Sequence, residues 1–315
     1  MDWNRSASQR HDESNGGRAQ KEGGDLTLTG RAVAYGAITV INAISCGLGA
    51  ALGVELKTEA YVELTDRPGR IEGKILSDPG ESTILIEKAV SKVLEYFGLQ
   101  DEYGAYVETR SNIPIARGLK SSSVAANAIV LAVLDALEEE IDDMTILNLG
   151  VDAAIDAGVT ITGAFDDASA SYFGGLTITD NRRREILKHI RDIKQYPVLI
   201  YVPEGKIYTS RSDVRRMRVI ADEVRALHRM ALRGDYWQAM TLNGIIYSEI
   251  LGFDAGTAID ALENGALAAG LSGTGPAVAA VVPEENIDDV REAWSKREGR
   301  LIETKINLKK AHVLE

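Results

Sequence analysis

Residues 113–123 combine glycine, lysine and three consecutive serines immediately before an apolar stretch. A loop of small residues that opens a helix presents unpaired backbone N–H groups, and the helix dipole adds partial positive charge. Serine hydroxyls can bind phosphate oxygens or a magnesium ion, and Lys120 adds a formal charge. Capping a helix needs one serine, such as Ser121, so the serine run favours a phosphate-binding loop over a plain cap. The predicted loop comprises Pro114, Ile115, Ala116, Arg117, Gly118, Leu119, Lys120, Ser121, Ser122 and Ser123.

Two further segments could contribute to such a site. Gly273, Thr274 and Gly275 belong to a run in which glycines alternate with small hydroxyl residues. Glycine lets a ligand approach the backbone closely, although a tight helix-to-strand turn has a similar composition. Asp166 and Asp167 are adjacent carboxylates between apolar segments. A carboxylate beside a substrate hydroxyl can accept or orient its proton, but a solvated turn or a helix cap would also account for the pair.

Motifs and composition disfavour several other classes of function. The sequence has no GxxxxGK[ST] motif, which excludes a Walker-A ATPase, and residues 47–53 miss the dinucleotide fingerprint by one position. The net charge of -12 disfavours nucleic acid and anionic membrane surfaces as partners. The single cysteine, Cys46, excludes an internal disulfide, and the four histidines are too scattered to predict a metal site.

The elements that must position these residues are a mixture of helices and strands without strict βαβ alternation, which predicts an α+β fold. Strands are predicted at residues 26–35, 50–64, 70–76, 103–109, 171–179, 198–202, 277–282 and 301–308, with 70–76 as the hairpin partner of 50–64. Helices are predicted at residues 82–97, 121–138, 145–157, 213–232, 236–251, 255–269 and 288–296.

The distribution of polar residues predicts how the chain is divided. Residues 1–24 lack any apolar period, which predicts a disordered tail without a secretory signal and hence a cytoplasmic protein. Residues 32–54 are uncharged and long enough to cross a bilayer, but their four glycines favour two strands joined by a loop. A polar and basic cluster at residues 180–184 predicts an N-terminal domain at 25–182 and a C-terminal domain at 183–315.

Together, these segments resemble the GHMP kinase superfamily, which includes galactokinase and the homoserine, mevalonate and phosphomevalonate kinases. Residues 271–277 resemble its C-terminal glycine motif and residues 30–32 its N-terminal motif, in the family's order, and the resemblance covers residues 25–310. Its central motif is matched by Pro114, Gly118, Leu119, Ser121 and Ser122. Lys120 and Val124 depart from the common pattern. The runs at 42–44, 118–123 and 163–175 are similar to the archaeal-type shikimate kinase branch.

The resemblance implies a two-domain GHMP kinase fold. Its N-terminal domain is like the second domain of ribosomal protein S5, its C-terminal domain is ferredoxin-like, and the active site lies between them. The implied reaction transfers the γ-phosphoryl group of ATP to the 3-hydroxyl of shikimate, a step of aromatic amino acid (chorismate) biosynthesis. By analogy, residues 114–123 would bind the ATP phosphates, Ser122 would help to hold Mg²⁺, and Lys120 would neutralise phosphate charge.

The resemblance also implies that an aspartate acts on the acceptor hydroxyl. Asp166 matches the family's Asp-x-Ala pattern and is preferred, whereas counting back from the Gly-Gly pair favours Asp167. The expected substrate-binding residues are Arg31, Asn42, Gly273, Thr274 and Gly275. Arginine suits a substrate carboxylate, and the candidates are Arg31, Arg117, Arg211, Arg215, Arg216 and Arg218.

Two alternative functions stay open. Another GHMP small-molecule kinase, homoserine kinase foremost, is disfavoured by the adjacent acids, since homoserine kinases are thought to lack a catalytic base there. A non-catalytic GHMP-like sensor is disfavoured by the intact acids and phosphate loop. ATP and a small-molecule substrate are the expected partners, no nucleic acid or membrane partner is expected, and homo-oligomerisation is left open.

Overall fold

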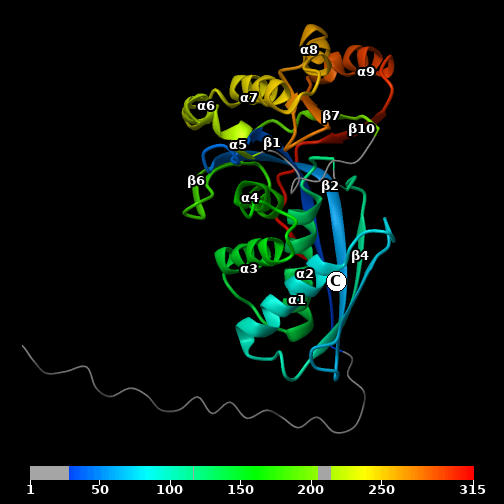
Figure 1. The fold of residues 1–315 in the computed structure, drawn as a ribbon. Coiled ribbons are helices and arrows are strands. Elements are labelled where there is room, and N and C mark those ends of the chain that lie inside the picture. The colour runs from blue at the N-terminus through cyan, green and yellow to red at the C-terminus, as the bar shows by residue number, and fades with distance from the viewer. Residues whose placement is uncertain (1–27, 116, 205–213) are drawn as a thin grey trace, which may run out of the picture.

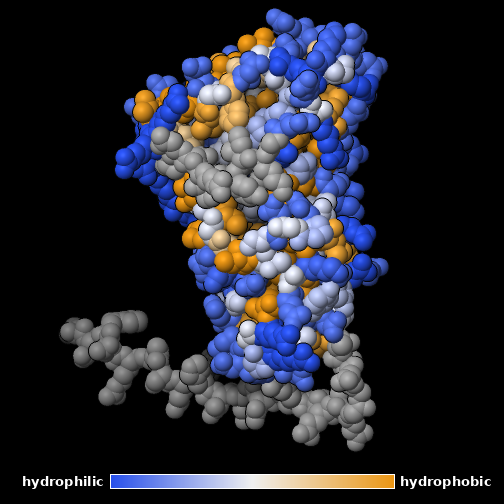
Figure 2. All heavy atoms as spheres, turned by 45° about the vertical axis from the view of Figure 1, so that its right-hand side comes forward, coloured by the Kyte–Doolittle hydropathy of each residue, from blue (hydrophilic) through white to orange (hydrophobic). Residues whose placement is uncertain are grey.

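The computed structural model describes residues 28–115, 117–204 and 214–315. These residues form two β-sheets with helices packed against them, which confirms the predicted α+β class (Figure 1). The tail predicted at residues 1–24 lies outside the described residues, as do Ala116 and Arg211. Hydrophilic side chains cover most of the face shown in Figure 2, with hydrophobic side chains interspersed.

The first sheet contains seven of the described strands and is built around β1 and β2. Its main order is β11 (His312–Val313), β1 (Thr29–Ile41), β2 (Leu48–Thr65), β4 (Gly104–Ser111) and β3 (Ile71–Ile75). β5 (Leu176–Asp180) also pairs with β2, and β6 (Glu185–Ile190) pairs with β5. The strand, loop and strand predicted within residues 32–54 are thus confirmed. In the described part of the chain, no helix is both long and apolar enough to span a membrane.

One edge of β2 pairs with β1, and the other edge is long enough to pair with two different strands. Residues 58–65 pair with β4, and residues 48–52 pair with β5. Side chains in the first of these segments alternate between buried and partly exposed positions, as expected for a strand with one face in the core. Residues 48–54 are almost entirely buried, and Val54 bridges Ile306 just beyond β10. This end of β2 therefore lies at the junction of the two sheets.

α2 (Ser121–Leu137) is the central helix of the layer on the first sheet. It contacts β1 and β2 and is also contacted by α1 (Ile84–Phe97), α3 (Asp143–Asp156) and α4 (Phe165–Phe173). A helix that is apolar around its circumference is stable when other elements surround it. The buried helix predicted at residues 121–138 is confirmed. Because α2 is fixed by its neighbours, the loop that enters it is anchored at one end.

The second sheet is antiparallel and has the order β10 (Arg300–Lys305), β7 (Pro197–Val202), β9 (Val278–Val281) and β8 (Ala268–Leu271). The helices of this region are α5 (Val214–Arg218), α6 (Ala221–Arg233), α7 (Tyr236–Leu251), α8 (Gly256–Glu263) and α9 (Ile287–Ser295). The chain passes from the first sheet to the second between Ile190 and Pro197. The domain division expected at residues 182 and 183 stays a prediction.

Several of the expected elements differ from the structure. The single helix predicted at residues 213–232 is divided into α5 and α6, with residues 219 and 220 between them. Residues 70–76 do not form a hairpin with β2, because β4 pairs with that part of β2 and β3 pairs in parallel with β4. Residues 171–173 were expected to begin a strand, but they form the last turn of α4. The helix ends there because Gly174 and Gly175 both have positive φ, and the strand begins only at Leu176. The helix predicted at 255–269 ends at Glu263, and β8 follows Gly265, whose φ is +91°.

The last part of the chain returns from the second sheet to the first, and we name residues 306–314 the return segment. Asn307 is fully buried; its backbone N–H donates to Gly53 and its carbonyl accepts from Gly175. Further along, the Ala311 N–H donates to the carbonyl of Tyr172 in α4. The return segment therefore completes backbone hydrogen bonds of β2 and α4.

Candidate active site

A cavity of about 400 Å³ lies at the N-terminal ends of α2 and α4. Its apolar wall includes Ile75, Ile84, Leu85, Ile129 and Ala154. Its polar wall includes Asn42, Lys120, Asp166, Asp167, Gly273 and Thr274, together with Ser121, Ser122 and Ser123. The three glycine, serine and aspartate segments identified in the sequence therefore meet at one cavity. An apolar pocket with a few convergent polar groups is the usual form of a small-molecule site.

The loop before α2 leaves the start of that helix uncapped. Lys120 is the N-cap residue, with φ of 65°, and makes no side-chain capping bond. Ser121 is the first helical residue, so the alternative that it caps α2 is wrong. N–H groups in the first turn of a helix have no partner within the helix, and together with the helix dipole they favour an anion. This geometry fits the phosphate-binding loop predicted at residues 114–123.

Not every residue of that loop reaches the cavity. Among the described lining residues are Ile115, Gly118, Leu119 and Lys120, but neither Pro114 nor Arg117. The Arg117 guanidinium instead donates to the carbonyl of Pro203, with a distance of 2.7 Å between Nη1 and the oxygen. Arg117 therefore ties the loop to the end of β7.

The loop also contacts the C-terminal glycine segment. The Ser272 hydroxyl donates to the carbonyl of Gly118 at 2.8 Å, and the Ala277 N–H donates to the carbonyl of Arg117 at 3.2 Å. Gly118 has φ of +78°, and a Cβ atom placed on it would collide with the carbonyl oxygen of Ser272. The two segments can lie this close only because residue 118 is glycine.

We expect Gly118→Ala to destabilise the protein by about 1–3 kcal/mol, because it adds a collision to a strained φ. Turnover should also fall, since the loop must shift away from Ser272. Thermal unfolding and steady-state kinetics measure the two effects. Gly69→Ala is the matched control: Gly69 has φ of +71° but nothing lies within 4 Å of its added Cβ. Equal loss in both variants would contradict a role for loop packing.

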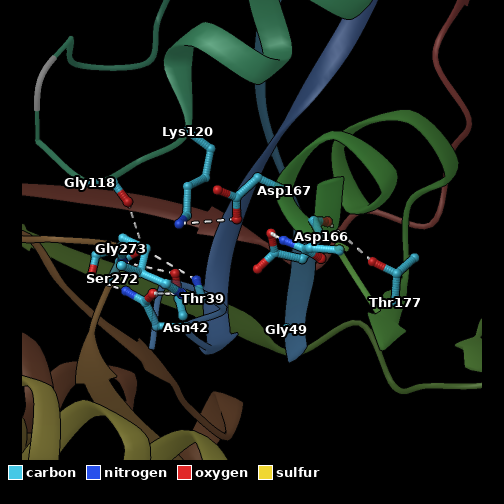
Figure 3. Close-up of polar contacts among 12 residues, drawn as sticks. Thr39, Asn42, Gly49, Gly118, Lys120, Asp166, Asp167, Thr177, Ser272 and Gly273 are labelled. Carbon is cyan, nitrogen blue, oxygen red and sulfur yellow. Dashed lines mark hydrogen bonds and ion pairs between the residues drawn. The ribbon is translucent and has the colours of Figure 1, made fainter. Parts of the chain in front are cut away.

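The turn between β1 and β2 joins the same glycine segment. The Asn42 amide donates to the carbonyl of Gly273 at 2.8 Å, and the Gly273 N–H donates to the Thr39 hydroxyl at 2.8 Å (Figure 3). The Asn42 N–H donates to the side-chain oxygen of Asn243 at 3.1 Å. Thr39 and Asn243 were not among the predicted site residues, because each is an ordinary polar residue in an apolar stretch. These bonds link the first sheet to the second beside the cavity.

The two predicted acids both lie in the first turn of α4 and are 4% and 7% exposed, so the solvated-turn alternative for Asp166 and Asp167 is wrong. Asp167 Oδ1 lies 3.0 Å from Lys120 Nζ, and these two side chains point toward one another in Figure 3. Burial and the neighbouring carboxylate of Asp166 raise the pKa of Asp167 to about 7, although Lys120 acts in the opposite direction. A buried carboxyl group with this pKa can exchange a proton near neutral pH.

Asp166 has different partners from Asp167. Its Oδ1 accepts a hydrogen bond from the Asn181 amide at 2.7 Å, and the Asn181 oxygen accepts from the Thr179 hydroxyl at 2.7 Å. A Cβ atom added to Gly49 would lie 2.5 Å from Asp166 Oδ2, so that glycine makes room for the carboxylate. Asn181 was missed because it belongs to the polar cluster interpreted as a domain boundary.

Other predicted residues lie away from this cavity. The Arg31 N–H donates to Asp135 near the far end of α2, about 20 Å along the helix from its N-terminus. An added Cβ on Gly275 would contact the ring of Phe253, and Gly275 is not among the described lining residues. Arg215, Arg216 and Arg218 are also not among the described residues that line the cavity. The structure therefore does not bring Arg31 or these arginines to the cavity wall.

Comparisons with known proteins agree with this arrangement. The family described as GHMP kinases N terminal domain matches residues 85–175, and the family described as GHMP kinases C terminal matches residues 225–300. A Methanosarcina mazei protein named shikimate kinase is 48% identical over 284 residues, which cover 90% of this chain and 96% of the relative. A Halobacterium salinarum protein of the same name is 42% identical over 283 residues, covering 89% and 98%.

Solved structures share the fold at lower identity. Homoserine kinase from Cytophaga hutchinsonii superposes with a TM-score of 0.72 at 19% identity, covering 94% of this chain and all of that one. Mevalonate kinase from Methanococcus jannaschii superposes with a TM-score of 0.68 at 16% identity, covering 91% and all of that chain. At these identities the likeness shows the fold alone.

Proposed function

The chain belongs to the GHMP kinase family, and from this premise we propose that it transfers the γ-phosphoryl group of ATP to the 3-hydroxyl of shikimate. The acceptor is supported by relatives named shikimate kinase that are 42–48% identical over about nine-tenths of this chain. The observation that carries the chemistry is the Lys120–Asp167 pair, which joins an uncapped helix N-terminus to a buried acid within one cavity.

Phosphate binding is proposed for residues 118–123. The free N–H groups of the first turn of α2 and the hydroxyls of Ser121, Ser122 and Ser123 would bind phosphate oxygens. Lys120 would bring its positive charge to the transferring group. Phosphoryl transfer depends mostly on such positioning and charge neutralisation.

The donor set also fits Mg²⁺. No group of three or more histidine, cysteine, aspartate or glutamate side chains forms a metal site within the described ranges. Mg²⁺ commonly binds through one or two protein ligands together with phosphate oxygens and water, so it can be bound together with the nucleotide. Ser122, on the cavity wall in the first turn of α2, is the proposed protein ligand. The ion would neutralise charge on the phosphates.

Proton transfer is proposed for Asp167. The acceptor oxygen attacks the γ-phosphorus, the bond to the β–γ bridging oxygen breaks, and ADP leaves with that electron pair. The acceptor proton passes to the Asp167 carboxylate. The sequence pattern favoured Asp166, but the contacts favour Asp167, since Asp167 pairs with the lysine of the phosphate loop and Asp166 is bound by Asn181.

The pH profile follows from this assignment. Asp167 can accept a proton only when it is ionised, and burial raises its pKa to about 7. We therefore expect kcat/KM to be constant at alkaline pH and to fall about tenfold per pH unit below about 7. We call this fall at low pH the acid limb of kcat/KM. Initial rates from pH 5 to 9, with the stability of the protein checked at each pH, measure it. An inflection near pH 4, typical of an unperturbed aspartate, would contradict the assignment.

Release of ADP by the purified protein tests the proposed function. Shikimate, homoserine, mevalonate and galactose would each be supplied with ATP and Mg²⁺. Turnover with shikimate alone is the expected result. Turnover with homoserine alone would assign a different GHMP kinase, and binding without turnover would assign a sensor. The cytoplasmic location and any homo-oligomer stay predictions.

A further inference from the structure

A relay of three side chains ends on Asp166. The Thr179 hydroxyl donates to Asn181 Oδ1, and Asn181 Nδ2 donates to Asp166 Oδ1, both at 2.7 Å. All three residues are buried. The Thr179 hydroxyl also lies 3.4 Å from the carbonyl oxygen of Gly49, but the much shorter contact to Asn181 Oδ1 is the favoured direction for its one hydrogen. This bond fixes the orientation of the Asn181 amide, because only the oxygen of an amide can accept it. The NH₂ group must then face Asp166.

This orientation decides which form of Asp166 is favoured. An amide NH₂ is a donor only, so it opposes protonation of Oδ1 and binds the charged carboxylate more strongly than the neutral acid. Gly49 leaves room for the second carboxylate oxygen. The neighbouring carboxyl, Asp167, is bound by no such amide among the residues that the structure describes, and it contacts Lys120 instead. Two adjacent buried carboxyls in equal surroundings would compete for one proton. The hydrogen bond from Asn181 makes their surroundings different, because it favours the charged form of Asp166.

We propose that Asn181, oriented by Thr179, is a positioning residue that stabilises the Asp166 carboxylate through its donated hydrogen bond and so reserves the proton of the acceptor hydroxyl for Asp167. This proposal rests on the proposed function. The charge of Asp166 raises the pKa of Asp167, which agrees with the division of roles.

Other titratable groups near the acids have separate contacts. Lys120 reaches Asp167 from the start of α2, and Asp180 accepts from backbone N–H groups of residues 182 and 183. His228 of α6 bonds to the carbonyl of Thr179, and burial lowers its pKa. Tyr247 of α7 donates to the carbonyl of Asn42, and burial raises its pKa. Within the described part of the chain, none of these groups donates to the Asp166 carboxylate, so Asn181 is the group to test.

The near-isosteric variants Asn181→Leu and Thr179→Val test the relay. Without the amide donor, Asp166 takes the first proton and becomes neutral, so Asp167 stays ionised to lower pH. We expect the acid limb of kcat/KM to move down by about one pH unit in Asn181→Leu and by less in Thr179→Val. Thr177→Val is the matched control, because the Thr177 hydroxyl donates to the backbone carbonyl of Asp166 and not to its carboxylate. Its limb should not move.

A shift of the acid limb to higher pH in Asn181→Leu would instead identify Asp166 as the proton acceptor. If Asp166 itself accepts the proton, loss of the amide moves the limb to higher pH, and that outcome overturns the proposal. An unmoved limb in Asn181→Leu, with thermal unfolding showing a folded protein, also overturns it. If Asn181→Leu does not fold, the limb of Thr179→Val decides.

A second readout does not depend on turnover. Infrared titration of the carboxyl C=O band follows protonation of the acid pair directly. In Asn181→Leu the first protonation should move to higher pH, even though the acid limb of kcat/KM moves to lower pH. An unchanged first protonation would overturn the proposal. Wild-type turnover on the acceptor panel separately tests the proposed function, so failure of one can be told from failure of the other.

Discussion

Asp167→Asn is expected to lower kcat by about 10²–10⁴-fold, the range that a general base contributes. The change keeps the size of the side chain but removes the group that accepts the acceptor proton. It also leaves Lys120, which is only 9% exposed, without its anionic partner. Binding of ATP should change little, since the phosphate loop keeps its N–H groups and serines. Steady-state kinetics and direct nucleotide titration separate the two effects.

Asp166→Asn is the matched control for this experiment. It removes the charge that raises the pKa of Asp167, so the acid limb of kcat/KM should move to lower pH while substantial turnover remains. If Asp167→Asn instead keeps more than about a tenth of wild-type kcat and Asp166→Asn is inactive, Asp166 is the proton acceptor.

Lys120→Met is expected to lower kcat by about 10²–10³-fold, comparable with the loss of one preorganised donor at a developing charge. The substitution keeps an unbranched side chain and removes the charge next to the phosphates. Lys120 also lowers the pKa of Asp167, so its loss should move the acid limb to higher pH. The shift in the limb and the fall in kcat would be measured in the same pH series.

Lys92→Met controls for the loss of a lysine charge as such. Lys92 lies on α1, where it forms a partly exposed ion pair with Asp156 at 2.7 Å. A pair of this kind contributes little, so kcat and its pH limb should be unchanged. A wild-type kcat in Lys120→Met would contradict a role for Lys120 in phosphoryl transfer.

The sequence was sufficient to predict three of the segments that line the cavity but not all of their supporting residues. The loop at 118–123 and the acids at 166 and 167 were predictable because glycine, serine runs and adjacent acids are rare inside apolar sequence. Asn181 and Thr179 were not, since a buried amide and a hydroxyl have no characteristic spacing. Arg31 was expected at the site because it adjoins a motif, yet β1 brings it to the opposite end of α2.

Strand pairing was harder to predict than strand position. The residues of β3 were correctly predicted to be a strand, but their pairing with β2 was wrong. β4, which comes later in the chain, lies between β2 and β3, and the local sequence pattern does not show this. The short β11 was not predicted, because two residues carry no period. β11 forms only by pairing with Ala32 and Val33 of β1, which lie far from it in the sequence.

The return segment has a consequence for how the protein is made on the ribosome. Asn307 and Ala311 complete backbone bonds of Gly53, Gly175 and Tyr172, which are translated well over a hundred residues earlier. A nascent chain that has not yet reached residue 307 therefore leaves those groups of Gly53 and Gly175 to water, and the helix bearing both acids gains its bond at Tyr172 only after residue 311 has been added.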